Sequence, residues 1–145
     1  MDELDYLGKD FKHFLAYHNA EKRGTRLYED GFQGDFAFET RKSVQNMAGN
    51  KIWILEGYGK PKTYLFRGYY DVDVVESDEN DDQLYYLVGK EGEFIEHEVV
   101  LNNEFWFPSL RRMQGNFGFG IQALRQEYVQ KFEILLAEHV SFRPF

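Results

Sequence analysis

The stretch Ile52-Trp53-Ile54-Leu55, followed by Gly57-Tyr58-Gly59-Lys60-Pro61 and then residues 63–75 (TYLFRGYYDVDVV), decides the fold. The first run is rich in β-formers, the second carries turn residues, and the third is a long segment rich in aromatic and β-branched residues. Together they predict a β-hairpin with a long second strand.

The period of two along a strand divides the second strand into two faces. It predicts that one face carries Tyr64, Phe66, Tyr70, Val72 and Val74, and that the other carries Arg67, Asp71 and Asp73. Gly68 interrupts the pattern, and a glycine inside a strand usually marks a bulge or a sharp bend. We therefore expect a sheet that curls on itself.

Further strands are predicted on both sides of this hairpin. They are Phe36–Thr40, Leu84–Val88 and Glu93–Leu101, the last with Ile95, His97, Val99 and Leu101 on one side. The acidic run Glu76–Asp82 cannot pack and is expected to form a solvated loop. The middle of the chain thus predicts an antiparallel meander of at least four strands.

Helical spacing is found towards both ends of the chain. Leu4, Leu7, Phe11, Phe14, Leu15 and His18 predict a helix from about residue 2 to residue 19, and Leu124, Tyr128, Phe132 and Leu135 predict a second one up to Val140. Residues 109–120 contain too much glycine for regular structure. We predict one α+β domain over 1–145, with a helix in 1–20, a strongly curved antiparallel meander or small barrel in 34–107, and a helix in 121–140.

The length and composition of the chain limit the kinds of protein to which it can belong. A chain of 145 residues is the usual size of one domain with a real core. The absence of cysteine excludes disulfides, thiolate zinc sites and cysteine nucleophiles. The acidic start is unlike a secretory signal, and no apolar run reaches the about 18 residues of a membrane helix. We expect a cytoplasmic protein without a membrane partner.

The net charge of −8 is unevenly distributed. Ten acidic residues and only Lys90 as a basic one lie between Glu76 and Glu104, for a net of −9, so the remainder carries a net of +1. Overall acidity argues against a nucleic-acid partner, because phosphate binding depends on clustered Lys and Arg. A neutral or mildly basic face elsewhere is compatible with this distribution.

Motifs for catalysis or metal binding are missing. The four histidines, His13, His18, His97 and His139, have no metal-ligand spacing. The acidic loop lacks the residue order of a calcium-binding EF-hand. We therefore expect no metal, no cofactor and no enzymatic activity; a small hydrolase using His97 is the least favoured alternative, because no nucleophile pairs with it.

Two groups of basic residues suggest anion binding. Lys60, Lys62 and Arg67 lie on or beside the hairpin near tyrosines, and cations interleaved with aromatic rings suit nucleic acid. Arg111 and Arg112 precede Gly115–Gly120, which is expected to open the last helix and to offer backbone amides to a phosphate. A structural crossover with Phe117 and Phe119 in the core, and ordinary surface lysines, explain the same residues without a ligand.

Three segments carry a family resemblance: Gly34-Asp35, residues 49–57 (GNKIWILEG) and residues 64–72 (YLFRGYYDV). They resemble the PUA-like domains, especially the EVE-like modules found beside HNH restriction nucleases, and Gly115–Gly120 before a terminal helix is similar to the end of such modules. The resemblance covers about residues 34–137. It implies a small curved β-barrel flanked by helices, with a pocket for a nucleotide or a flipped, modified base.

The leading hypothesis is therefore a non-enzymatic module for nucleic acid or a modified nucleotide. Its predicted pocket residues are Trp106, Arg111, Arg112 and Asn116, and its predicted phosphate contacts are Lys60, Lys62 and Arg67. The chain has no HNH segment, so a separate nuclease is the partner that the resemblance implies. The alternative is an interaction, accessory or immunity factor whose acidic stretch 76–104 binds a basic protein.

Overall fold

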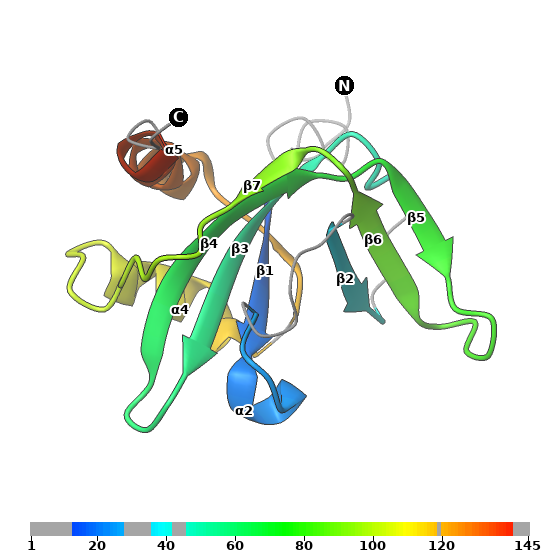
Figure 1. The fold of residues 1–145 in the computed structure, drawn as a ribbon, viewed down its shortest axis with the longest axis horizontal. Helices are drawn as coiled ribbons and strands as arrows, with labels where there is room; N and C mark the ends of the chain where they lie inside the picture. The colour runs from blue at the N-terminus through cyan, green and yellow to red at the C-terminus, as the bar shows by residue number, and fades with distance from the viewer. Residues whose placement is uncertain (1–12, 28–35, 42–45, 119, 141–145) are drawn as a thin grey trace.

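The computed structural model describes residues 13–27, 36–41, 46–118 and 120–140 (Figure 1). Its strands are β1 (His13–Asn19), β2 (Phe36–Thr40), β3 (Lys51–Tyr58), β4 (Thr63–Asp71), β5 (Val74–Ser77), β6 (Tyr85–Gly89), β7 (Gly92–Phe94) and β8 (Gln122–Ala123). Its helices are α2 (Ala20–Arg23), α4 (Phe107–Met113), a 3-10 turn (Gly115–Phe117) and α5 (Gln126–Val140). The predicted α+β class is confirmed.

The strands form two separate sheets. The first has the order β7-β4-β3-β1-β8 and the second the order β2-β6-β5. β1 runs parallel to β3, whereas the other pairs are antiparallel, so the prediction of a purely antiparallel sheet is wrong for the first sheet. In the part of the chain described, the strands do not close into a barrel.

β3 lies at the centre of a three-layer arrangement. Its Trp53 and Leu55 pack in a core shared with α4 and α5, while Ile52 and Ile54 pack in a second core shared with the other sheet. Figure 1 shows the two helices on one side of β3 and β4 and the second sheet on the other. Because both faces are covered, β3 reads as a continuous apolar run rather than an alternating one.

The predicted hairpin is confirmed as β3 and β4, and so is the bulge at Gly68. The pairing shifts register there, since Ile54 pairs with Gly68 but Leu55 pairs with Phe66. The extra residue, Arg67, reverses which face the later side chains occupy. The prediction of one shared face is therefore wrong: Tyr64 and Phe66 join the helix-side core, whereas Tyr70 and Val72 join the core between the sheets.

The predicted long second strand is divided between the two sheets. β4 ends at Asp71 in the first sheet, and β5 begins at Val74 in the second. At the corner the Val72 amide donates to the Asn50 carbonyl, and the Asp73 amide donates to the Val88 carbonyl, at 2.9 and 2.8 Å. These bonds transfer the chain from one sheet to the next.

The prediction of an N-terminal helix is wrong where the structure tests it. Residues 13–19 form β1, and residues 2–12 of the expected helix lie outside the described residues. β1 lies between β3 and β8, so Leu15 is buried in one core and Ala16 in the other. A strand buried on both faces loses its alternation, and its apolar residues then also fit a helical spacing.

The predicted strand Glu93–Leu101 is only partly a strand. β7 pairs with β4 up to Phe94, and the ladder resumes where Phe66 donates to the Val99 carbonyl at 2.9 Å. Between these points the Ile95 amide still donates to the Arg67 carbonyl at 2.9 Å, and the Arg67 guanidinium adds side-chain bonds: its Nη1 donates to the carbonyls of Ile95 and Glu96 at 3.0 and 2.8 Å.

The C-terminal region differs from the sequence prediction at its start. α5 ends at Val140 as expected and buries Tyr128, Val129, Phe132 and Leu135, but Ser109–Met113 is helical rather than irregular. β8 separates the glycine-rich segment from α5, so that segment does not open the helix as predicted. Among the helices that the structure describes, none is long and apolar enough to cross a membrane.

Candidate functional site

The tip of the β3–β4 hairpin is held against α2 by one carboxylate. Glu21 accepts from Lys62 Nζ at 2.8 Å and from the Gly59 amide at 3.0 Å, and Lys62 also contacts Asn19 Oδ1 at 3.3 Å. The Gly59 amide, followed by Lys62, lowers the pKa of Glu21. Lys60 is exposed on the same turn. The turn thus presents two lysines, one of them positioned by Glu21.

Arg111 of α4 is fixed across the face of a β4 tyrosine. Its guanidinium carbon lies 4.8 Å from the ring centre of Tyr64, and its Nε and Nη2 donate to Asn116 Oδ1 at 3.2 and 2.8 Å. A guanidinium that stacks on a ring and is held along one edge loses most of its rotational freedom. Arg111 and Asn116, both predicted as site residues, are therefore brought together.

The backbone that carries Asn116 is strained. Three successive residues are left-handed: Gly115 has a φ of 58°, Asn116 of 57° and Phe117 of 62°. Glycine and asparagine tolerate this region, but a bulky residue such as phenylalanine rarely occupies it. Phe117 is buried in the helix-side core, and its burial holds the turn that presents Asn116 to Arg111. Such strain is concentrated at functional positions.

Aromatic rings form the floor beneath Arg111. Tyr17 stacks on Phe117 at 4.9 Å between ring centres, and Tyr64 lies 5.7 Å from Phe117. Tyr17 crosses β3 at Gly57, where a Cβ atom would lie 1.9 Å from the tyrosine hydroxyl oxygen. Burial, followed by Tyr64 and nearby carboxylates, raises the pKa of Tyr17 well above its ordinary value. The floor is therefore neutral and packed.

Lys62 and Arg111 lie on the same side of the first sheet. Lys62 Nζ contacts Asn19 Oδ1, and Asn19 shares a face of β1 with Tyr17, which packs against the helix-side core. Arg111 covers Tyr64 on that same side from α4. Arg112 is exposed on the same short helix. We call the group Lys60, Lys62, Arg111, Arg112 and Asn116 the hairpin–α4 surface.

Two predicted site residues lie elsewhere. Trp106 is only 8% exposed and packs against Phe107, Tyr128 and Phe132, so it belongs to the core. Arg67 was expected on the polar face of its strand, yet it is fully buried. The bulge turns its side chain inward, which removes it from any phosphate at the surface.

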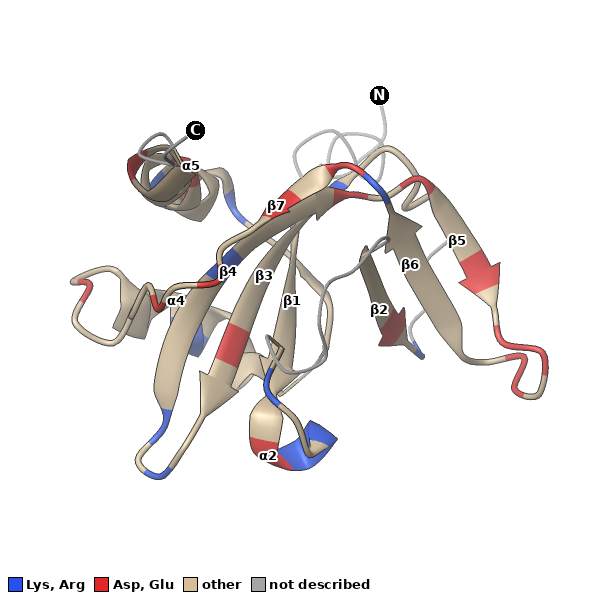
Figure 2. Cartoon of the chain, viewed as in Figure 1, with Lys and Arg blue, Asp and Glu red and all other residues tan. Residues whose placement is uncertain are grey.

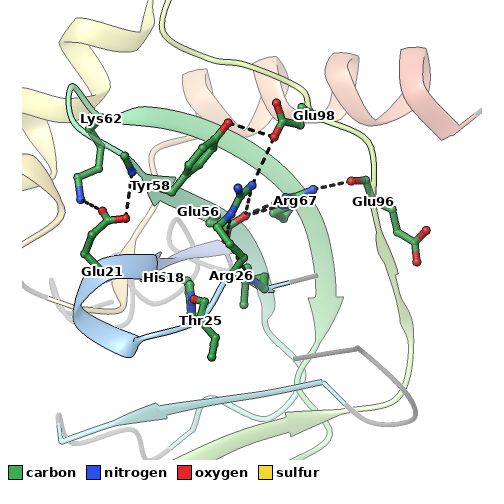
Figure 3. A network of polar contacts seen from close by, with 12 residues as sticks. His18, Glu21, Thr25, Arg26, Glu56, Tyr58, Lys62, Arg67, Glu96 and Glu98 are labelled. Atoms are coloured by element: carbon green, nitrogen blue, oxygen red, sulfur yellow. Dashed lines mark hydrogen bonds and ion pairs between the residues drawn. The ribbon is translucent and has the colours of Figure 1, made fainter. Parts of the chain in front are cut away.

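Arg67 belongs to a buried ionic network that sequence reasoning missed (Figure 3). Glu56, which is fully buried, accepts from Arg67 Nε at 2.9 Å, from Arg26 Nε at 2.8 Å and from the Leu27 amide at 2.9 Å. Burial by itself raises the pKa of Glu56, but the bonds from Arg26, Leu27 and Arg67 outweigh it and lower the pKa. The sequence does contain a signal for this network: Glu56 follows the apolar run Ile52–Leu55, and Arg67 precedes Gly68 on the other strand of the hairpin.

The outer end of this network is closed by Tyr58 and Glu98. The Arg26 guanidinium carbon lies 3.5 Å from the ring centre of Tyr58, and the Tyr58 hydroxyl donates to Glu98 Oε2 at 3.1 Å. Arg26 Nη2 is 3.5 Å from the same carboxylate oxygen. The network thus ties the segment after α2 to β3, β4 and residues 95–98, which is a structural role.

The acidic loop predicted at Glu76–Asp82 lies on another part of the molecule, between β5 and β6. Figure 2 shows that the β5–β6 connection is acidic and distant from the basic β3–β4 turn. Asp78 accepts from the Tyr86 hydroxyl at 2.7 Å, and Asp81 pairs with Arg41 at 2.7 Å. The Tyr86 hydroxyl lowers the pKa of Asp78, and the Gln83 amide followed by Arg41 lowers that of Asp81. Polar contacts with Tyr86 and Arg41 therefore hold the predicted acidic loop in place.

The histidines have separate partners. His13 Nδ1 accepts from Trp53 Nε1 at 3.0 Å, His18 Nε2 contacts the Thr25 carbonyl at 2.7 Å, and His97 Nε2 contacts His139 Nδ1 at 2.8 Å. Within the described ranges, no three His, Asp or Glu side chains gather as metal ligands.

No family model, curated protein or solved structure matches this chain.

Proposed function

We propose that this chain is a non-enzymatic module that binds nucleic acid through the hairpin–α4 surface. The observation that carries the proposal is the Arg111 guanidinium, which lies over the Tyr64 ring and is hydrogen-bonded to Asn116. A preorganised guanidinium binds phosphate oxygens with little further loss of entropy. Lys60 on the turn and Arg112 on α4 are exposed and supply the additional positive charge that backbone phosphates require, whereas Lys62 on the same turn is paired with Glu21.

The position of the acidic residues of the β5–β6 connection also supports nucleic-acid binding at the hairpin–α4 surface. The acidic β5–β6 connection lies away from the β3–β4 turn, so its carboxylates do not face a phosphate bound there (Figure 2). Exposed charges are screened beyond about 10 Å at 0.1 M salt. An overall net charge of −8 is therefore compatible with local binding of an anion.

The finer part of the proposal is a PUA-like reader of a modified base that works in the cytoplasm with a separate nuclease. It rests on the resemblance of residues 49–57 and 64–72 and on the curvature that the Gly68 bulge gives to β4. Trp106 and Arg67 are left out of this version because both are buried.

Fluorescence anisotropy with labelled oligonucleotides tests the proposal. Single- and double-stranded DNA and RNA, plain and methylated, are titrated at two salt concentrations. Three phosphate contacts give a log–log slope of about −2.7 on duplex DNA, so affinity falls about 40-fold for a fourfold rise in salt. No binding to any of these oligonucleotides at low salt contradicts the proposal, and a preference for the methylated ones supports its finer part.

A second function is favoured by the ordered acidic loop. Because Asp78 and Asp81 are held by Tyr86 and Arg41, the β5–β6 connection presents a defined acidic surface to a basic protein. Charge reversal at Glu79 and Asp82, which are exposed, tests it without breaking those contacts. Loss of a basic partner in a pull-down favours this function, and retention of that partner rejects it.

A further inference from the structure

Two histidines join the edge of the first sheet to the last turn of α5. His97 Nε2 and His139 Nδ1 are 2.8 Å apart, and the ring centres are 4.9 Å apart. Imidazole nitrogens at this distance share one proton, since one nitrogen donates and the other accepts. The contact therefore exists only while at least one of the two rings is neutral.

His97 lies in the segment where the β4 ladder is interrupted. Ile95 keeps one backbone bond, from its amide to the Arg67 carbonyl at 2.9 Å. Beyond it, Arg67 Nη1 donates to the carbonyls of Ile95 and Glu96 and lies 3.5 Å from that of His97. Glu98 contacts Tyr58 and Arg26. With the histidine pair, these contacts attach the segment to β4, to the Arg26 segment and to α5.

We infer that the His97–His139 contact is a proton-operated latch between residues 95–98 and α5. Imidazole is the side chain that most readily takes up a proton between neutral and mildly acidic pH. The first proton leaves one ring neutral and keeps the contact, so the contact breaks only when the second ring is charged as well. Two imidazolium ions have no acceptor between them and repel each other. The latch is closed while one of the two rings is neutral and opens once both are charged.

The charged groups around the pair do not replace the contact. Glu98, on the same segment, directs its carboxylate to Arg26 and Tyr58, and Arg67 of β4 contacts the segment through backbone carbonyls (Figure 3). Glu96 and Glu138 are exposed. Because their carboxylates are screened by water, neither can substitute for the contact between the two rings.

Hydrogen exchange followed by NMR tests the latch in the full chain. On going from pH about 7.5 to about 5.5, amides of residues 97–99 and 136–140 lose about threefold to tenfold in protection, the equivalent of one ordinary hydrogen bond, after correction for intrinsic rates. Nitrogen shifts of the imidazoles report their protonation in the same samples. Unchanged protection, or one ring that stays neutral at the lower pH, overturns the inference.

Two variants separate the latch from general effects of acid. His139→Asn places an amide oxygen near the position of Nδ1, where it accepts from His97 at either pH, so protection no longer changes with pH. His13→Asn is the matched control, because it keeps an acceptor for Trp53 Nε1 and leaves the response to pH intact. A loss of protection in His139→Asn as large as in the parent chain contradicts the latch.

Discussion

The Arg67 guanidinium and the Glu56 carboxylate are paired at 2.9 Å across the bulge of the β3–β4 hairpin, and neither side chain is exposed. The carboxylate is shared with Arg26, so one buried anion compensates two guanidinium groups. Because a buried charge is costly without its partner, loss of either member of this pair is expected to destabilise the β3–β4 hairpin, which carries part of the hairpin–α4 surface.

Glu56→Gln is expected to destabilise the protein by about 3–5 kcal/mol, because Arg67 is left charged and buried without its counter-ion. Urea unfolding followed by Trp fluorescence measures the change. Arg23→Ala is the control, since Arg23 and Glu39 form a pair whose side chains are 48% and 36% exposed. That substitution costs at most about 1 kcal/mol; equal costs for the two variants contradict the assigned role.

The contribution of Glu56 depends on pH with a definite sign. The folded state holds the pKa of Glu56 below its ordinary value of 4.5, so its stabilisation is present above that value. It is lost as pH falls through the lowered folded pKa. The difference in unfolding free energy between the parent chain and Glu56→Gln therefore shrinks between pH about 7 and about 3. A constant difference across this range refutes the prediction.

Gly68→Ala is expected to disrupt the pairing of β4 with β7. Gly68 has a φ of 112°, and an added Cβ would lie 1.9 Å from the Glu93 carbonyl oxygen. Gly24→Ala is matched to it, because Gly24 has a φ of 83° but nothing within 4 Å of the added atom. Gly24→Ala costs about 1–2 kcal/mol for the left-handed backbone alone, and Gly68→Ala exceeds it by about 1–3 kcal/mol. Equal thermal shifts argue against the close approach.

The hairpin and the last helix were predictable, because their signals are local. Ile52–Leu55 with its turn predicts β3 and β4, and the spacing of Tyr128, Phe132 and Leu135 predicts α5. β1 was mistaken for a helix because its partner, Lys51–Gly57, is distant in sequence and both of its faces are buried. Nothing local distinguishes such a strand from a buried helix.

The candidate site was predictable only in part, for a related reason. Arg111 and Asn116 are five residues apart, and their proximity follows from the short helix and turn between them. Arg67 was misplaced because a bulge reverses the two faces of a strand, and its exact position is set by the partner strand. The pairing of Arg67 with Glu56 and Arg26 depends on that reversal.

Two substitutions at Asn116 distinguish the effect of its strained backbone on stability from the effect of its side chain on oligonucleotide binding. Asn116→Gly keeps the left-handed turn and the stability of the fold, whereas Asn116→Ala costs about 1 kcal/mol in that conformation. Both variants release Arg111 and are expected to weaken oligonucleotide binding to a similar degree. Thermal unfolding and fluorescence anisotropy, measured on the same preparations, give the effects on stability and on binding. If Asn116→Gly binds oligonucleotides as tightly as the parent chain, Asn116 does not hold Arg111 for binding.

The most direct test compares the oligonucleotide Kd of Arg111→Ala with that of Lys90→Ala at low salt. Both remove one positive charge, but Arg111 lies on the hairpin–α4 surface and Lys90 lies in the acidic stretch 76–104. We predict that Arg111→Ala raises Kd at least about tenfold, the loss of a hydrogen-bonded charge, and that Lys90→Ala leaves it within about twofold. Equal effects of the two substitutions, or none from Arg111→Ala, would contradict binding at this surface.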